Sequence, residues 1–204
     1  MIRLHATMAS INAYKVRILL SMLDLPYELV DIDMYGGEHK REPFLSLNRF
    51  GQMPALQDND YKIADSHACL VYLARKYDRG DDWLPADAEG EAKVCEWLSK
   101  SANEVHQGPW MKRAKIRRPD AIKVPDEEID ARCDHILGIM DSHLTETDWL
   151  ALGRATIADI SCFAAISMLK VSGYDTDKWP GVTRWLDRFR ALPGAIDIDG
   201  NSLN

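Results

Sequence analysis

The sequence has no uninterrupted apolar run that approaches the ~20 residues of a membrane-spanning helix, so we expect no membrane partner. Its first residues also lack the long apolar block of a secretory signal, which makes cytoplasmic residence the expected localisation. Basic residues are fewer than acidic ones: the sequence has 25 Lys and Arg and 32 Asp and Glu, which give a net charge of −7. An acidic surface repels the phosphate backbone, so we expect no nucleic-acid partner either.

Cysteine is scarce, and its placement argues against two kinds of site. The chain has four cysteines, which lie far apart and form no Cys-x-x-Cys pair: Cys69, Cys95, Cys133 and Cys162. This spacing disfavours both a structural zinc site and a dithiol redox motif. The six histidines are scattered and form no His-x-x-x-His pair, so we expect no metal cofactor.

The sequence does contain enough apolar material for two small cores, since 46% of its 204 residues are hydrophobic. Apolar and polar residues alternate at residues 2–5 and again at 30–34, which predicts two half-buried strands. Between them lies a helical pattern of apolar residues, formed by Val16, Leu19, Leu20 and Leu23. A β-α-β unit with parallel strands is therefore expected at the start of the chain.

The remaining pattern predicts two domains of different class. Two shorter strands are expected at 55–57 and 61–63, followed by a helix that includes residues 70–77. We therefore predict an α/β domain over residues 1–78, a linker over 79–88 and an all-α domain over 89–204. Within the all-α domain, Thr156 and Asp159 are spaced as a capping box that begins a helix.

Several short motifs carry a resemblance to a known family. They are residues 10–17 at the first helix, 48–54 before a short strand, 64–68 at the next helix, and fragments at 37–39, 43–45 and 153–159. Their order and spacing resemble the glutathione transferase superfamily, and more narrowly its bacterial serine-type cytosolic members. The resemblance implies the glutathione transferase fold, in which a thioredoxin-like domain binds glutathione as co-substrate and an all-α domain shapes the pocket for an electrophile.

The chemistry that the resemblance implies depends on a thiolate. The thiol of glutathione, with a pKa of ~8.5, is mostly protonated at neutral pH, and only its thiolate attacks an electrophile well. A hydroxyl donor and the positive end of a helix both stabilise a thiolate. Ser10 precedes the first helix and matches the family's catalytic serine by motif position, and Asn12 is a second candidate for the same role. A serine at this place also often serves only as a helix cap.

The resemblance assigns six residues to glutathione itself: His39, Gln52, Met53, Pro54, Asp65 and Ser66. Met53-Pro54 matches the family's cis proline, where the main chain of Met53 pairs with the cysteinyl backbone. Ser66 matches the site for the α-carboxylate of the γ-glutamyl group, and Asp65 the site for its amino group. Gln52 and His39 match residues at the glycine end, although His39 is equally consistent with a plain surface histidine.

The pocket for the electrophile is the least specified part of the sequence. Trp110 and Met111 are the predicted lining residues, and simple core packing is the other interpretation of an aromatic side chain there. The basic stretch at 112–123 either steers an anionic co-substrate or forms a solvated face.

The leading hypothesis is a detoxifying glutathione transferase that conjugates glutathione to a small hydrophobic electrophile. The resemblance also implies a homodimer. One alternative is a glutathione-dependent isomerase, peroxidase or ether-cleaving enzyme. Residues 10–17 are similar in their latter half to the loop of maleylacetoacetate isomerases, but they lack its Ser-Ser-Cys. The other alternative is a non-catalytic binding module with the same fold.

Overall fold

The computed structural model describes all 204 residues and divides them into two compact units. Residues 1–81 and 192–204 form the first unit, and residues 82–191 form the second. The sequence analysis assigned residues 192–204 to the helical domain, so the structure differs from it at the C-terminus. The reason is a set of contacts with the first helix, of which one is a hydrogen bond of 2.6 Å from the Tyr14 hydroxyl to the carbonyl of Ile196.

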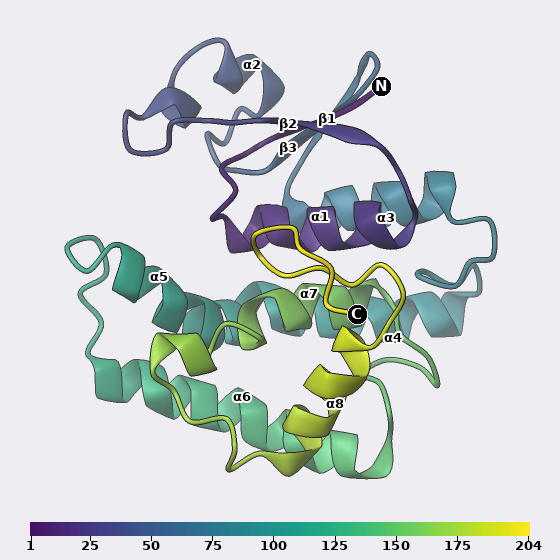
Figure 1. The fold of residues 1–204 in the computed structure, drawn as a ribbon, viewed down its shortest axis with the longest axis vertical. Helices are drawn as coiled ribbons and strands as arrows, with labels where there is room; N and C mark the ends of the chain where they lie inside the picture. Colours follow the sequence, from purple (N-terminus) through teal and green to yellow (C-terminus); the bar gives the residue numbers. More distant parts are fainter. The chain divides into compact units, whose positions relative to one another are not determined.

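The first unit is built on a four-stranded sheet with the order β2-β1-β3-β4 (Figure 1). Its strands are β1 (Ile2–His5), β2 (Tyr27–Val30), β3 (Ala55–Asp58) and β4 (Tyr61–Ala64). Strand β1 runs parallel to β2 and antiparallel to β3, and β3 runs antiparallel to β4. The structure confirms the predicted parallel β-α-β unit and the short hairpin that follows it.

The predicted second strand is displaced in the structure. We predicted it at residues 30–34, whereas β2 ends at Val30. Strand β1 reaches only to His5, which is paired with Val30, so the chain beyond Val30 has no neighbouring strand to pair with. The alternation that misled the prediction comes from Ile32, which is buried in a separate cluster with Phe44 and Ala55.

Helices cover both faces of this sheet. Figure 1 shows α1 (Ile11–Met22) and α3 (Ser66–Tyr77) side by side on one face and the short α2 (Phe44–Leu47) on the other. A single turn of 3₁₀-helix, η1 (Glu38–Lys40), precedes α2. Nine of the residues of α1 are buried, from Ile11 to Leu20. The α1 helix therefore forms the centre of the first unit.

The second unit begins with a long helical run of three parts, α4 (Ala88–Lys100), η2 (Ser101–Trp110) and α5 (Met111–Arg117). The sequence predicted a helix here, but the middle part, η2, is a π-helix. Pro109 lies inside it and has no N–H to donate, which favours a departure from α-helical bonding. Beside it, a Cβ on Gly108 would lie 3.0 Å from the main-chain nitrogen of Cys133, so a larger residue there would force the main chain at Cys133 to move by a few tenths of an ångström.

The rest of the second unit consists of α6 (Asp126–Glu146), α7 (Ile157–Ile166), the 3₁₀ turn η3 (Lys170–Ser172) and α8 (Pro180–Arg190). Helices α4, η2 and α8 pack against α7. All ten residues of α7 are buried, and the helix begins with the predicted capping box of Thr156 and Asp159. No helix in the structure combines the length and the apolar character that crossing a membrane requires.

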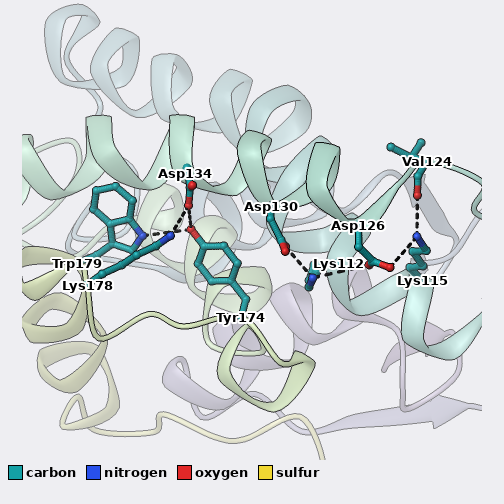
Figure 2. Close-up of polar contacts among 9 residues, drawn as sticks. All are labelled: Lys112, Lys115, Val124, Asp126, Asp130, Asp134, Tyr174, Lys178 and Trp179. Atoms are coloured by element: carbon teal, nitrogen blue, oxygen red, sulfur yellow. Dashed lines mark hydrogen bonds and ion pairs between the residues drawn. The ribbon is translucent and has the colours of Figure 1, made fainter.

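Polar contacts along α6 fasten it to its neighbours (Figure 2). The Asp134 carboxylate accepts hydrogen bonds from the Tyr174 hydroxyl and, at 2.6 Å, from the Lys178 ammonium. The indole of Trp179 donates to the same Tyr174 hydroxyl at 3.2 Å. These bonds hold the segment before α8 against the middle of α6.

Candidate active site

The register of the sheet brings the predicted glutathione residues to one edge. His5 at the end of β1 pairs with Ala55 at the start of β3, and Ala55 pairs with Ala64 at the end of β4. The residues after β1, before β3 and after β4 therefore meet at one edge. The chain after β2 leaves from the same edge, because His5 also pairs with Val30.

Both long helices of the first unit begin at this edge, each as the next element after a strand that ends there. Helix α1 starts at Ile11, after the loop that leaves β1, and α3 starts at Ser66, next to the end of β4. The N-terminus of a helix has unpaired N–H groups and a partial positive charge, which both favour anions. The edge therefore presents two places suited to negative groups.

Ser10 lies at the first of these places as the N-cap of α1. Its Oγ accepts a hydrogen bond from the main-chain nitrogen of Ala13 at 3.2 Å, and its own N–H donates to the Thr7 carbonyl at 3.1 Å. A serine hydroxyl can accept and donate at the same time. The capping bond uses an acceptor lone pair, so the hydroxyl hydrogen of Ser10 is left to donate to a ligand.

Asn12, the second candidate for stabilising the sulfur, lies on the first turn of α1 and is half-buried. Its amide makes no hydrogen bond to another residue of the chain. Tyr14 is placed differently, because its buried hydroxyl donates to the carbonyl of Ile196. The hydroxyl hydrogen of Tyr14 is therefore already used within the chain.

The loop before β3 carries Gln52, Met53 and Pro54. The Met53–Pro54 peptide bond is cis, as the resemblance implied. The main-chain N–H and C=O of Met53 make no hydrogen bond to the rest of the chain, and the side chain of Gln52 is exposed. The buried proline thus leaves the main chain before it available to a peptide ligand.

His39 reaches the same region through the turn η1. The Lys40 ammonium donates to the Gly51 carbonyl at 2.6 Å, which joins this turn to the loop that carries Gln52. Gly51 has a φ of +58°, and a Cβ there would lie 2.9 Å from the carbonyl oxygen of His39. The structure therefore brings His39 next to the loop of Gln52.

Asp65 and Ser66 form the second place suited to an anion, at the start of α3. One carboxylate oxygen of Asp65, Oδ1, accepts from the main-chain nitrogens of His67 at 2.8 Å and Ala68 at 3.1 Å. Ser66 is 5% exposed, and its N–H and hydroxyl make no hydrogen bond to another residue. Asp65 has a φ of 76°, a conformation that costs a non-glycine residue about 1–3 kcal/mol and that occurs preferentially at functional sites.

The first unit supplies no reactive thiol at this edge. Burial raises the pKa of Cys69, the only cysteine of the first unit, to about 12, so it stays protonated at neutral pH. No cluster of three His, Cys, Asp or Glu side chains is arranged to hold a metal ion.

The two predicted pocket residues lie on the helical run of the second unit. The ring of Trp110 stacks on His106 with centroids 4.1 Å apart, and the Arg118 guanidinium lies over it. The sulfur of Met111 contacts the Arg132 guanidinium at 3.9 Å. Both side chains are half-buried, and their role toward an electrophile is an expectation from the resemblance alone.

Two cations of the basic stretch are engaged within the second unit, as Figure 2 shows. The Lys112 ammonium lies 2.6 Å from Asp130 and 3.7 Å from Asp126. The Lys115 ammonium donates to the Val124 carbonyl at 2.7 Å and to Asp126 at 3.1 Å. These two lysines join α5 to α6, a role that the sequence analysis did not consider.

Arg17 is a further buried charge that the sequence analysis missed. Its side chain is 0% exposed, and one of its nitrogens donates to the carbonyl of Met8 in the loop before Ser10. No signal for this burial was present in the sequence, because Arg17 and Ser21 lie one turn apart on the least apolar side of the helix.

The first unit is a thioredoxin-like domain, because it has a mixed sheet with two helices on one face and its candidate ligand groups lie at the edge where both helices begin. The second unit is an all-α domain. Comparison with protein families agrees with this class. The models named "Glutathione S-transferase, N-terminal domain" and "Glutathione S-transferase, C-terminal domain" match residues 2–75 and 117–193. The chain therefore belongs to the glutathione S-transferase family of enzymes.

Individual relatives extend over nearly the whole chain. A glutathione S-transferase of Hyoscyamus muticus is 30% identical over 205 residues, which cover 94% of each chain. The crystal structure of a glutathione S-transferase from Xanthobacter autotrophicus matches with a TM-score of 0.89 at 26% identity and covers 98% of both chains. A glutathione transferase of Phanerochaete chrysosporium in complex with oxidized glutathione matches with a TM-score of 0.83 at 29% identity, over 95% of this chain and 92% of that one.

Proposed function

We propose that this chain binds glutathione at the shared edge of the sheet and conjugates its thiolate to a small hydrophobic electrophile. The observation that carries the proposal is the convergence of Ser10 and Ser66 at the N-termini of α1 and α3, on one edge of one sheet. A peptide with a carboxylate at one end and a thiolate in its middle is a fitting ligand for two such places.

The binding roles follow from the groups that remain available. The N–H and hydroxyl of Ser66 take the γ-glutamyl carboxylate, and the second carboxylate oxygen of Asp65 takes the γ-glutamyl amino group. The main chain of Met53 pairs with the cysteinyl residue in the manner of an added strand, beside Pro54. Gln52 and His39 lie on adjoining turns and hold the glycine end.

Ser10 supplies the chemistry in this proposal. Its hydroxyl donates to the glutathione sulfur, and the positive end of α1 favours the same negative charge. The thiolate then forms a carbon–sulfur bond with the electrophile, which expels its leaving group as an anion. The rest of the rate enhancement comes from holding the two reactants in contact, with Trp110 and Met111 as proposed lining residues.

Two measurements on the intact chain test this function. We expect retention on immobilised glutathione and turnover of a chloro-nitroaromatic with glutathione. Retention without turnover, unchanged in the Ser10→Ala variant, would identify a binding module. Turnover restricted to a peroxide or a cis-enone would identify the peroxidase or isomerase alternative. The proposal includes a homodimer, for which sedimentation is expected to give twice the mass of one chain.

Replacing Ser66 with alanine is expected to weaken glutathione binding about ten- to hundredfold, because a hydrogen bond to a charged group contributes roughly 1.5–3 kcal/mol. Calorimetric titration with glutathione measures the loss. The exposed Ser46 belongs to the same unit, and its hydroxyl donates only to the Pro43 carbonyl, so Ser46→Ala provides the control variant. Equal affinities of the Ser66→Ala and Ser46→Ala variants would contradict the assignment of the carboxylate site.

A further inference from the structure

The C-terminal segment, residues 192–204, has a defined fold of its own within the first unit. It turns back on itself through a bridge between Ile196 and Ser202. The carboxylate of Asp197 stabilises the turn by accepting from the main-chain nitrogens of Asp199 at 2.9 Å and Asn201 at 2.8 Å. The segment is therefore an ordered structural element.

The segment is seated closely on α1. Gly194 has a φ of +76°, and a Cβ there would lie 2.9 Å from the Cα of Met22, so only glycine allows this contact. Two side chains of α1 hold the next turn through its main chain. The Tyr14 hydroxyl donates to the carbonyl of Ile196, and a guanidinium nitrogen of Arg17, Nη2, donates to that of Ile198, each at 2.6 Å.

The same nitrogen of Arg17 also holds the loop that leads to Ser10. Nη2 donates to the Met8 carbonyl at 3.1 Å. Met8 is two residues before Ser10, and the turn between them is closed by the bond from the Ser10 N–H to the Thr7 carbonyl. Arg17 thus links the carbonyl of an active-site loop to the carbonyl of the C-terminal segment through one atom.

Stability alone does not account for this arginine. The guanidinium is fully buried, and its Nε and Nη1 make no hydrogen bond, although Tyr14, Tyr27 and Asp199 lie near enough to favour its charge. Removing an arginine from water is costly, and an apolar side chain of similar volume is often at least as stable in such a place. An apolar side chain, however, cannot donate the two hydrogen bonds that Arg17 gives to the carbonyls of Met8 and Ile198.

We propose that Arg17 is a positioning residue for Ser10, which it holds in place through Met8 against the C-terminal segment. The inference rests on the proposed role of Ser10 toward the glutathione sulfur. A hydrogen bond to the sulfur depends steeply on distance and angle, so a loop that is free to shift weakens it. Without the Arg17 contact, the Ser10 hydroxyl is expected to stabilise the thiolate less well.

The test compares Arg17→Met with Arg3→Met, a matched control in the same unit. Arg3 is about half exposed and pairs only with Glu28 on the surface. Thiolate absorbance against pH gives the pKa of bound glutathione in each variant. We expect Arg17→Met to raise this pKa by about half a unit to one unit and to lower kcat at neutral pH about three- to tenfold, with the KM for glutathione changed less than threefold. Arg3→Met is expected to match the parent chain.

A double-mutant cycle identifies the route of the effect. If Arg17 acts through Ser10, the Ser10→Ala and Ser10→Ala/Arg17→Met variants will have the same thiol pKa. An additional rise in the double variant would overturn the proposal, and so would a folded Arg17→Met variant with the parent pKa. If the parent chain itself does not lower the pKa of glutathione, the proposed function fails instead.

A chain that ends at Asp197 provides a second variant in case Arg17→Met does not fold. It keeps Arg17 and the Ile196 carbonyl that Tyr14 contacts, but it lacks the carbonyl of Ile198. We expect it to show part of the pKa rise seen with Arg17→Met. A parent-like thiol pKa in this shortened chain would overturn the role assigned to the segment. Arg17→Lys, which keeps the charge but not the fork of donors, is expected to fall between the parent and Arg17→Met.

Discussion

Replacing Ser10 with alanine is expected to raise the pKa of bound glutathione by about one unit, because a hydrogen bond to a charged group is worth roughly 1.5–3 kcal/mol and one pKa unit corresponds to 1.36 kcal/mol. At neutral pH the thiolate fraction falls accordingly, and turnover is expected to fall about tenfold or more. Affinity for glutathione is expected to change little, since in the proposed complex the hydroxyl contacts only the sulfur. Thiolate absorbance as a function of pH measures the shift directly.

The helix-capping role of Ser10 calls for a separate control. Alanine removes the capping bond to Ala13 as well as the donor to the sulfur, and lost caps typically cost ~1 kcal/mol of stability. Glycine at this position also lacks the hydroxyl, but it costs the helix only a few tenths of a kcal/mol. Ser10→Gly and Ser10→Ala are therefore expected to show the same thiol pKa. Titration curves equal to that of the parent chain would refute the assignment of Ser10.

Replacing Asp159 with alanine is expected to destabilise the second unit by about 4 kcal/mol or more. The carboxylate is completely buried and accepts from the main-chain nitrogens of Leu150 at 3.0 Å and Thr156 at 2.9 Å, and from the Trp185 indole at 3.0 Å. The Thr156 hydroxyl also donates to this carboxylate, at 3.1 Å. Each buried donor left without a partner costs roughly 1–3 kcal/mol, and alanine leaves four of them. Urea unfolding followed by tryptophan fluorescence measures the loss.

Two further variants show whether the loss of stability comes from the buried hydrogen bonds of Asp159. Asp159→Asn keeps one acceptor oxygen, so its loss is expected to lie between those of the parent and Asp159→Ala. Asp177→Ala removes an exposed carboxylate of the same unit that pairs only with Lys170, and such surface pairs contribute about 0–1 kcal/mol. Equal losses for Asp159→Ala and Asp177→Ala would contradict the prediction. They would show that the buried capping box contributes no more to stability than a surface ion pair.

Much of the first unit was predictable because its signals are local. The apolar stripe of α1 and the turn between β3 and β4 depend on residues close together in the sequence, and both are present in the structure. The one misplaced strand, expected at 30–34 and found at Tyr27–Val30, depends on which residues pair with β1. Pairing is a contact between distant residues, and alternation alone does not reveal its register.

In the candidate site, too, the features that depend on local sequence were predicted, and those that depend on contacts between distant residues were not. The motifs that contain Ser10, Met53-Pro54 and Asp65-Ser66 were visible as sequence, and they identified the family that the comparisons then showed. Their meeting at one edge depends on the pairing of His5 with Ala55 and of Ala55 with Ala64. The π-helix η2 was not visible, because the apolar stripe of a helix does not distinguish the two bonding patterns over a short stretch.

The amino-acid sequence by itself determined the family of the protein, the caps of its helices and the chemical groups available for catalysis. Each of these depends on side-chain type and short-range spacing. Tertiary structure alone decided which groups face one another. It seated residues 192–204 on α1, it engaged Lys112 and Lys115 with α6, and it placed Arg17 between Met8 and Ile198. Each of these contacts joins parts of the chain that meet only after burial has brought their helices and loops together.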